Sequence, residues 1–174
     1  SGAKANISRS ITSFAEGSVK NNDSYREAEA LIRDYHGAAE GRILIDASIH
    51  AEYTNTVTRI TEVADLAKKY GVNMHVHVSE TKQEHEECKA RHGGRTPAQL
   101  LCDLGAFDTR TTAAHCVWAE EEDIEIFSEK GVTVATCPVS NLKLASGVCN
   151  VPALMKKGVN VAVGTDSVAS NNSL

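Results

Sequence analysis

The sequence predicts an α/β fold in which parallel strands alternate with helices that cover them on the outside. Short runs rich in valine, isoleucine and alanine alternate with longer amphipathic runs along nearly all of the 174 residues. The connections between them are short, which favours parallel strands joined by right-handed crossovers. Reactive polar side chains also recur where the predicted strands end, the edge at which a (β/α)8 barrel carries its functional groups. We therefore expect one barrel-like domain over residues 1–174.

Six runs fit strands because apolar and β-branched residues dominate them. They are residues 4–12, 42–50, 74–79, 111–117, 132–137 and 159–166. The second carries the sequence Ile-Leu-Ile, typical of a buried strand. Pro138 ends the fifth, since proline cannot donate a hydrogen bond to a sheet.

Helices are expected between the strands, where most runs repeat apolar residues every three to four positions. They are residues 25–36, 56–70, 81–92, 97–105, 120–130 and 151–157. Gly71 and Gly158 follow helices where a C-cap glycine is expected, and Pro97 occupies a first turn. Residues 120–130 begin with acids and end with lysine, which matches the helix dipole. We expect a loop over residues 139–144.

The composition is that of an acidic globular protein. The net charge is −5 and no basic stripe is present, so a nucleic-acid partner is not expected. No run approaches the length of a membrane span, and no signal peptide is recognised, so we expect a cytoplasmic protein without membrane contact. The five cysteines form no Cys-x-x-Cys pair, which predicts free thiols and argues against a cysteine zinc site.

Two histidines share one face of a predicted strand. In Met-His-Val-His-Val-Ser-Glu the period of two places His75 and His77 on the same side, and Glu80 follows beyond the strand. Imidazole binds metals and carries protons near neutral pH. His75 lies further from the carboxyl end of the strand, so we expect it in the core.

Other predicted strands also carry reactive side chains near their carboxyl ends. Arg9, His50, His115 and Asp166 each belong to a different strand. Because parallel strands end at one edge, these side chains are expected to converge with the histidine pair. No glycine-rich phosphate loop follows any strand, so the usual nucleotide-binding markers are absent from the sequence.

The histidines in the predicted helices have a simpler interpretation. The run 81–92 is strongly charged, and we expect a solvated helix there. His85 and His92 would then lie at the surface, as would His36 in its own helix.

Four motifs run in order through nearly the whole chain. They are His-Val-His-Val-Ser-Glu-Thr at 75–81, Ala-Ala-His-Cys at 113–116, Pro-Val-Ser-Asn-Leu-Lys-Leu at 138–144 and Gly-Thr-Asp-Ser-Val-Ala-Ser-Asn-Asn at 164–172. Together they resemble the amidohydrolase superfamily, and within it the 5'-methylthioadenosine/S-adenosylhomocysteine deaminases and their chlorohydrolase-like relatives. The resemblance implies a metal-dependent hydrolase that releases ammonia from adenosine-type thioethers.

The same resemblance implies roles for the residues of the reaction. His77 and Asp166 would be ligands of one divalent metal, with zinc expected and iron as the alternative. His115 and Asp166 would act on the attacking water, and Glu80 would be the acid that protonates the purine ring.

Substrate contacts are implied as well. His50 and Arg9 resemble residues that hold the substrate, and Glu80 would contact its ring. The expected partner is a small purine nucleoside.

One family feature is absent from this sequence. The family begins its barrel with a His-x-His pair on the first strand, and no such pair precedes Arg9. By this comparison residues 1–174 correspond to about strands 3 to 8 of a barrel truncated at both ends. The metal site would then be incomplete, and the isolated chain is expected to be inactive. The alternatives are a chlorohydrolase or other aminohydrolase of the superfamily, or a non-catalytic partial barrel that associates with itself.

An open barrel would expose two strand edges, near residues 4–9 and 159–166, and an inner face that includes Val76 and Val134. Unpaired strand edges readily pair with another chain. We therefore expect a homo-oligomer that forms through these edges.

Overall fold

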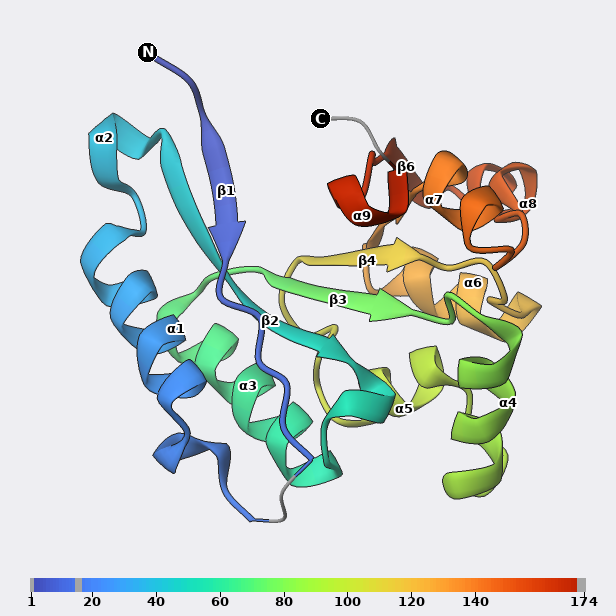
Figure 1. Ribbon diagram of the computed structural model, residues 1–174, viewed down its shortest axis with the longest axis horizontal. Helices are drawn as coiled ribbons and strands as arrows, with labels where there is room; N and C mark the ends of the chain where they lie inside the picture. The colour runs from blue at the N-terminus through green and yellow to red at the C-terminus, as the bar shows by residue number, and fades with distance from the viewer. Residues whose placement is uncertain (1, 15–16, 172–174) are drawn as a thin grey trace.

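Six parallel strands form one sheet in the computed structural model, which describes residues 2–14 and 17–171. The sheet follows the order of the sequence, and each strand is parallel to its neighbours. The strands are β1 (Ala5–Ser8), β2 (Ile43–Ala51), β3 (Met74–Val78), β4 (Thr111–His115), β5 (Thr133–Thr136) and β6 (Asn160–Val163). The predicted parallel, partial barrel is confirmed (Figure 1).

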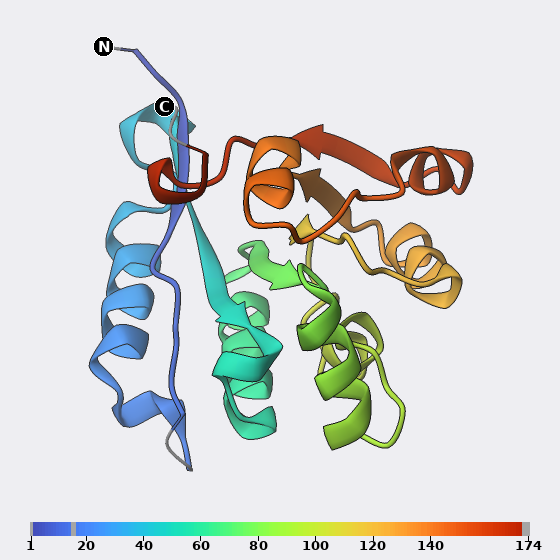
Figure 2. The ribbon, with the colours of Figure 1, turned by 45° about the vertical axis from the view of Figure 1, so that its right-hand side comes forward.

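Helices cover the outer side of the curved sheet, as Figure 2 shows. The longer ones are α1 (Asp23–Tyr35), α3 (Val57–Tyr70), α4 (Lys82–Arg91), α5 (Pro97–Asp103) and α6 (Glu121–Glu129). The shorter helical segments are η1 (Val19–Asn21), α2 (Ala38–Gly41), η2 (Glu52–Thr54), α7 (Pro138–Lys143), α8 (Val151–Lys156) and α9 (Val168–Asn171).

The predicted loop over residues 139–144 is wrong, because α7 begins there. Pro138 is pre-organised for the first turn of a helix. Ser140 and Asn141 are fully buried, and tertiary contacts therefore stabilise this short helix.

The apolar core lies between the sheet and the helices. Val76 and Val134 are 0% exposed and pack in one cluster with helix residues such as Leu66 and Phe127. Our placement of these two valines on the inner face is therefore wrong. Because side chains alternate along a strand, the inner face of β3 carries histidines instead.

β1 is shorter than the predicted strand 4–12. The chain leaves the sheet after Ser8, and Ile11 then forms an isolated bridge with Ile49. All four residues of β1 are exposed. Among the residues described, no helix is long and apolar enough to cross a membrane.

Candidate active site

Four histidines from three neighbouring strands lie together at the sheet. The ring centroids of His50 on β2 and His77 on β3 are 4.9 Å apart, and those of His77 and His115 on β4 are 5.3 Å apart. His75 packs edge-on against His77 at 5.7 Å. The parallel register brings these side chains together, since Val78 pairs with His115 and His77 with Ala51.

Hydrogen bonds orient two of these rings. His77 Nδ1 lies 2.7 Å from the carbonyl oxygen of His50, and His115 Nδ1 lies 2.9 Å from Asn141 Oδ1. Both partners are oxygens that only accept, so each Nδ1 carries the proton. The Nε2 atoms of His77 and His115 therefore keep their lone pairs when the rings are neutral.

Burial keeps the other two rings neutral. It lowers the pKa of His75 to about 4, and the charges of His77 and His115 add to the shift. Burial also lowers the pKa of His50, with a further contribution from His77. His75 is half-buried and packs against His77 on the face of β3 opposite the core residue Val76, so its expected placement in the core is wrong.

Glu80 is the acid closest to this group. One of its carboxylate oxygens lies 3.7 Å from His115 Nε2. The backbone at this turn is held by Glu84, whose carboxylate accepts hydrogen bonds from the amides of Ser79 and Glu80 at 3.1 and 2.7 Å. Burial raises the pKa of Glu84 to about 7, although these amide bonds oppose the shift.

Asp166 follows β6, and each of its carboxylate oxygens accepts a hydrogen bond. Ser140 donates to Oδ2 at 2.5 Å and the amide of Ser167 donates to Oδ1 at 2.6 Å. Burial would raise the pKa of Asp166, but these hydrogen bonds outweigh it, and the pKa lies below its ordinary value. The carboxylate is therefore ionised at neutral pH.

Unusual backbone conformations coincide with these residues. Ser79, His115 and Asp166 have φ angles of 48°, 69° and 60°, in the left-handed region that non-glycine residues rarely adopt. Such conformations cluster at functional sites because the surrounding structure must enforce them. All three lie where a strand ends or has just ended.

Arg9 is not in contact with the histidine group. Its guanidinium pairs with Glu27 of α1 at 2.7 Å and also donates to Ser24. Its role in substrate binding remains a prediction.

Two of the helical histidines depart from the expected surface positions. His85 is 2% exposed and lies 3.0 Å from both Ser79 Oγ and Glu120 Oε1, so its placement at the surface is wrong. The α4 face around it is buried, because it packs against the turn that carries Glu80. His92 is partly buried beside Glu52, whereas His36 is exposed as expected.

The comparisons with known proteins identify the family of this chain. The model of the amidohydrolase family matches residues 2–174. The chain belongs to the amidohydrolase family. The candidate residues lie at or just after the ends of neighbouring strands, the edge at which (β/α)8 barrels carry their functional groups.

Three relatives illustrate the similarity of this amidohydrolase chain. A 5-methylthioadenosine/S-adenosylhomocysteine deaminase from Caldanaerobacter subterraneus is 47% identical over 99% of the chain. A 5'-deoxyadenosine deaminase from Methanothermobacter thermautotrophicus is 44% identical over 86% of it. The chain spans 40% and 35% of their respective lengths. The crystal structure of a zinc-bound adenosine deaminase from Xanthomonas campestris matches with a TM-score of 0.86 and 34% identity, over 96% of this chain and 38% of that one.

The side chains of His77 and Asp166 have the right protonation to bind a divalent cation, but two ligands are fewer than a catalytic zinc site usually has. The ring tautomers leave Nε2 of His77 free, and Asp166 is ionised, as ligands must be. Catalytic zinc, however, usually has three protein ligands. Within the described part of the chain, His77, His115 and Asp166 do not form a group of three whose ligand atoms all lie within 4.8 Å of one another.

Sequence reasoning did not assign Ser140, Asn141 and Glu84 to the site. We interpreted residues 139–144 as loop architecture, yet Ser140 contacts Asp166 and Asn141 contacts His115. The motif at 138–144 was the available signal for the first two. Glu84 carried no signal, since it is one of several acids in a charged helix.

Proposed function

We propose that this chain forms the part of a hydrolytic deaminase that acts on the purine ring of adenosine-type nucleosides. The observation that supports the proposal best is the contact of Glu80 with His115, beside His77 and close to an ionised Asp166. The relatives named as deaminases of methylthioadenosine, S-adenosylhomocysteine and 5'-deoxyadenosine suggest the nucleoside class.

Deamination of an aminopurine requires water to add at the carbon that carries the amino group, while the neighbouring ring nitrogen gains a proton. A carboxylic acid can donate that proton, and Glu80 is the candidate because its carboxylate faces the histidine group. His115 Nε2 can accept a proton from the water, since its lone pair is free while Asn141 holds Nδ1–H. The same nitrogen can then return that proton to the leaving amino group, which departs as ammonia. The second proton of the water passes to Glu80, so that the ring carbonyl forms and the acid is regenerated.

Two residues of this chain are candidates for contacts with the nucleoside substrate. His50 lies next to His77 and donates or accepts through Nδ1 with Thr54 Oγ1 at 3.2 Å, so Nε2 remains available for a ribose hydroxyl. We propose His50 as a substrate contact and leave Arg9 as a second candidate whose guanidinium would first have to leave Glu27.

A divalent cation, with zinc as the first choice, would supply an activated water by lowering its pKa to about 7. His77 and Asp166 are the residues of this chain that would hold it. The lowered pKa of Asp166 favours that role, because the carboxylate needs no deprotonation.

The proposal can be tested in a chimaera. The matching 173 residues of the Caldanaerobacter subterraneus relative are replaced by this chain, and ammonia release is followed with methylthioadenosine, S-adenosylhomocysteine and 5'-deoxyadenosine. We expect turnover, and a loss of roughly 10²- to 10⁴-fold on His115→Asn. His36→Asn is the matched control, because His36 caps α1 and contacts the backbone of Ile45, away from the histidine group.

Two results would contradict the proposal. A folded chimaera that releases no ammonia from any of the three nucleosides would exclude deamination by these residues. A chimaera that instead releases chloride from a chlorinated triazine would favour the chlorohydrolase alternative.

A further inference from the structure

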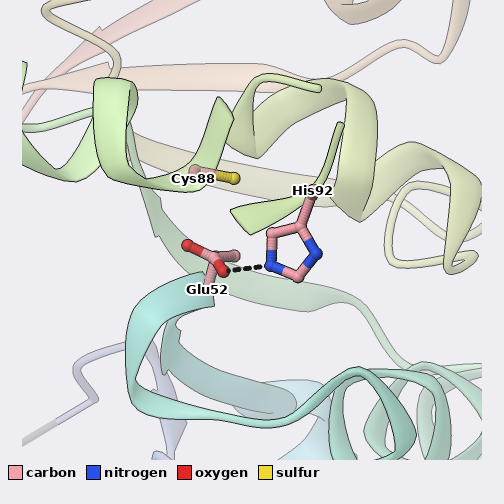
Figure 3. Close-up of side chains that lie close together, drawn as sticks. All are labelled: Glu52, Cys88 and His92. Atoms are coloured by element: carbon pink, nitrogen blue, oxygen red, sulfur yellow. Dashed lines mark hydrogen bonds and ion pairs between the residues drawn. The ribbon is translucent and has the colours of Figure 1, made fainter. Parts of the chain in front are cut away.

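A second cluster of metal-binding side chains lies away from the strand-end histidines. Glu52 comes from η2, directly after β2, whereas Cys88 and His92 stand one turn apart at the end of α4. Figure 3 shows the three side chains facing one another. Their ligand atoms all lie within 4.8 Å of one another, the arrangement that the catalytic candidates do not reach.

The cluster is well enclosed. Cys88 is 0% exposed and Glu52 is 3% exposed, while the ring of His92 is 22% exposed. A buried carboxylate requires a cation or strong hydrogen bonds. Glu52 receives one contact on each oxygen, from His92 Nε2 at 2.9 Å and from Arg91 Nη2 at 2.7 Å.

The chemistry of the three donors favours one kind of cation. A thiolate, an imidazole nitrogen and a carboxylate oxygen together suit zinc, whereas magnesium and calcium prefer oxygen alone. Without a cation, burial raises the pKa of the Cys88 thiol to about 12, and the charge of Glu52 adds to the shift.

The distances need only a small adjustment. Ligand atoms at about 2.0–2.3 Å from a tetrahedral zinc ion lie roughly 3.3–3.8 Å from one another. The contact of 2.9 Å between His92 Nε2 and Glu52 Oε1 would have to widen by less than about 1 Å. His92 is the C-cap of α4 and is partly exposed, so it can make this shift.

An adjacent cleft supplies access. Glu52, Arg91 and His92 line a cleft of about 340 Å³ that opens to solvent. A cation can enter from this side, and a water molecule can complete a four-coordinate site. Arg91 is 40% exposed and holds only Oε2 of Glu52, which leaves Oε1 for the metal.

We propose that Glu52, Cys88 and His92 form a zinc site that fastens α4 to the connection after β2. Zinc would bind Cys88 Sγ, His92 Nε2 and Glu52 Oε1. The thiol proton leaves to solvent, and the proton that His92 Nε2 donates to Glu52 is exchanged through solvent to Nδ1, so that the ring stays neutral. The site is structural, and it is independent of the proposed deaminase chemistry. Because α4 carries Glu84, the fastening also steadies the turn that presents Glu80.

Cobalt(II) is the probe that separates this site from the histidine group. The metal-free chain is titrated with Co²⁺, and a cobalt–thiolate charge-transfer band is followed in the near ultraviolet. We expect the band to saturate at one Co²⁺ per chain, and Zn²⁺ to abolish it by displacement. The histidine group includes no cysteine, but Cys137 is close to Asp166 and Glu80, so it needs a control.

Matched variants assign the band. We expect Cys88→Ser to remove it and His92→Gln to weaken Co²⁺ binding by at least roughly 10- to 100-fold. Cys137→Ser and Cys102→Ser, a half-buried cysteine on α5, should keep the band. Zn²⁺ should also raise the Tm of the wild-type chain by more than that of Cys88→Ser.

Two outcomes of the cobalt titration would overturn the proposal. It is overturned if the wild-type chain develops no cobalt–thiolate band at saturating Co²⁺, or if the band survives in Cys88→Ser. Far-ultraviolet circular dichroism shows whether Cys88→Ser is folded. Should it be unfolded, His92→Gln decides, and unchanged Co²⁺ affinity in that variant overturns the proposal.

Discussion

At the scale of single residues, the candidate site depends on neighbours that fix the protonation of its reactive atoms. Asn141 is 1% exposed, and its Oδ1 lies 2.9 Å from His115 Nδ1. An amide oxygen only accepts, so this contact selects the tautomer in which Nε2 faces Glu80 without a proton. Ser140 holds Asp166 in a comparable way from the preceding position of α7.

Asn141→Leu should release the tautomer of His115. The substitution keeps a similar volume but removes the acceptor, and a buried Nδ1–H without a partner costs about 1–3 kcal/mol. We therefore expect the Nε2–H tautomer to become populated, as measured from ¹⁵N chemical shifts and two-bond couplings in the labelled chain. Ser140→Ala is the control, since Ser140 contacts Asp166 instead. An unchanged tautomer in Asn141→Leu would show that another group holds the ring.

Glu80→Gln tests the acid. In the chimaera described above, we expect kcat to fall by roughly 10²- to 10⁴-fold, because an amide cannot donate the proton that the ring nitrogen needs. The metal content measured by elemental analysis should stay the same. Loss of metal on this substitution would mean that Glu80 is a ligand, and our assignment of its role would be wrong.

At the scale of elements, the connection from β3 to α4 carries a buried carboxylate that is coupled to stability. Glu84 has its pKa raised to about 7, mainly by burial. At Glu84, the folded chain therefore binds more protons than the unfolded chain between the ordinary glutamate pKa of about 4.5 and about 7. The contribution of Glu84 to the free energy of unfolding is fully present below this window and declines as pH rises through it.

Glu84→Gln should remove that decline. His75, with its pKa lowered to about 4, contributes in the opposite direction over part of the window, because its protonation in the unfolded chain destabilises the fold as pH falls. The observable is therefore the difference between wild type and Glu84→Gln in free energy of unfolding, measured by urea titration from pH 4.5 to 8. We expect this difference to change through the window and to level off above pH 7. A difference that is constant with pH would refute the coupling.

At the scale of the whole molecule, the open edges of the sheet predict association. All four residues of β1 are exposed, and Val163 at the end of β6 is 79% exposed. A strand edge with free amide and carbonyl groups pairs readily with another chain, and burying its apolar residues adds about 25 cal/mol per Å². We therefore propose that the 174-residue chain forms a dimer or larger assembly through these edges.

Val163→Lys should weaken that assembly, since a lysine on an edge strand opposes pairing. Light scattering at micromolar concentration should show a larger mass for wild type than for the variant. Val148→Lys is the matched control, because Val148 is 77% exposed but lies in the segment between α7 and α8. A wild-type chain that is monomeric under these conditions would show that the edges do not pair.

The sequence by itself determined the fold class and the strand positions of His50, His77 and His115, whereas Arg9 and Asp166 lie beyond the ends of their strands. Period-two alternation identified the face of β3 that carries His75 and His77, and the helical period identified α1 and α3. These patterns are local, because each depends on the geometry of one element. Parallel topology then follows from the short connections, and it brings strand ends to one edge.

Tertiary structure alone decided which side chains meet. The contacts of His115 with Asn141, of Arg9 with Glu27 and of Glu52 with His92 join residues 26, 18 and 40 positions apart. No local period encodes such pairs, since they depend on how separate elements dock. For the same reason the buried His85, the helix α7 and the Glu52, Cys88 and His92 cluster could not be foreseen, because their environment comes from packing against distant segments.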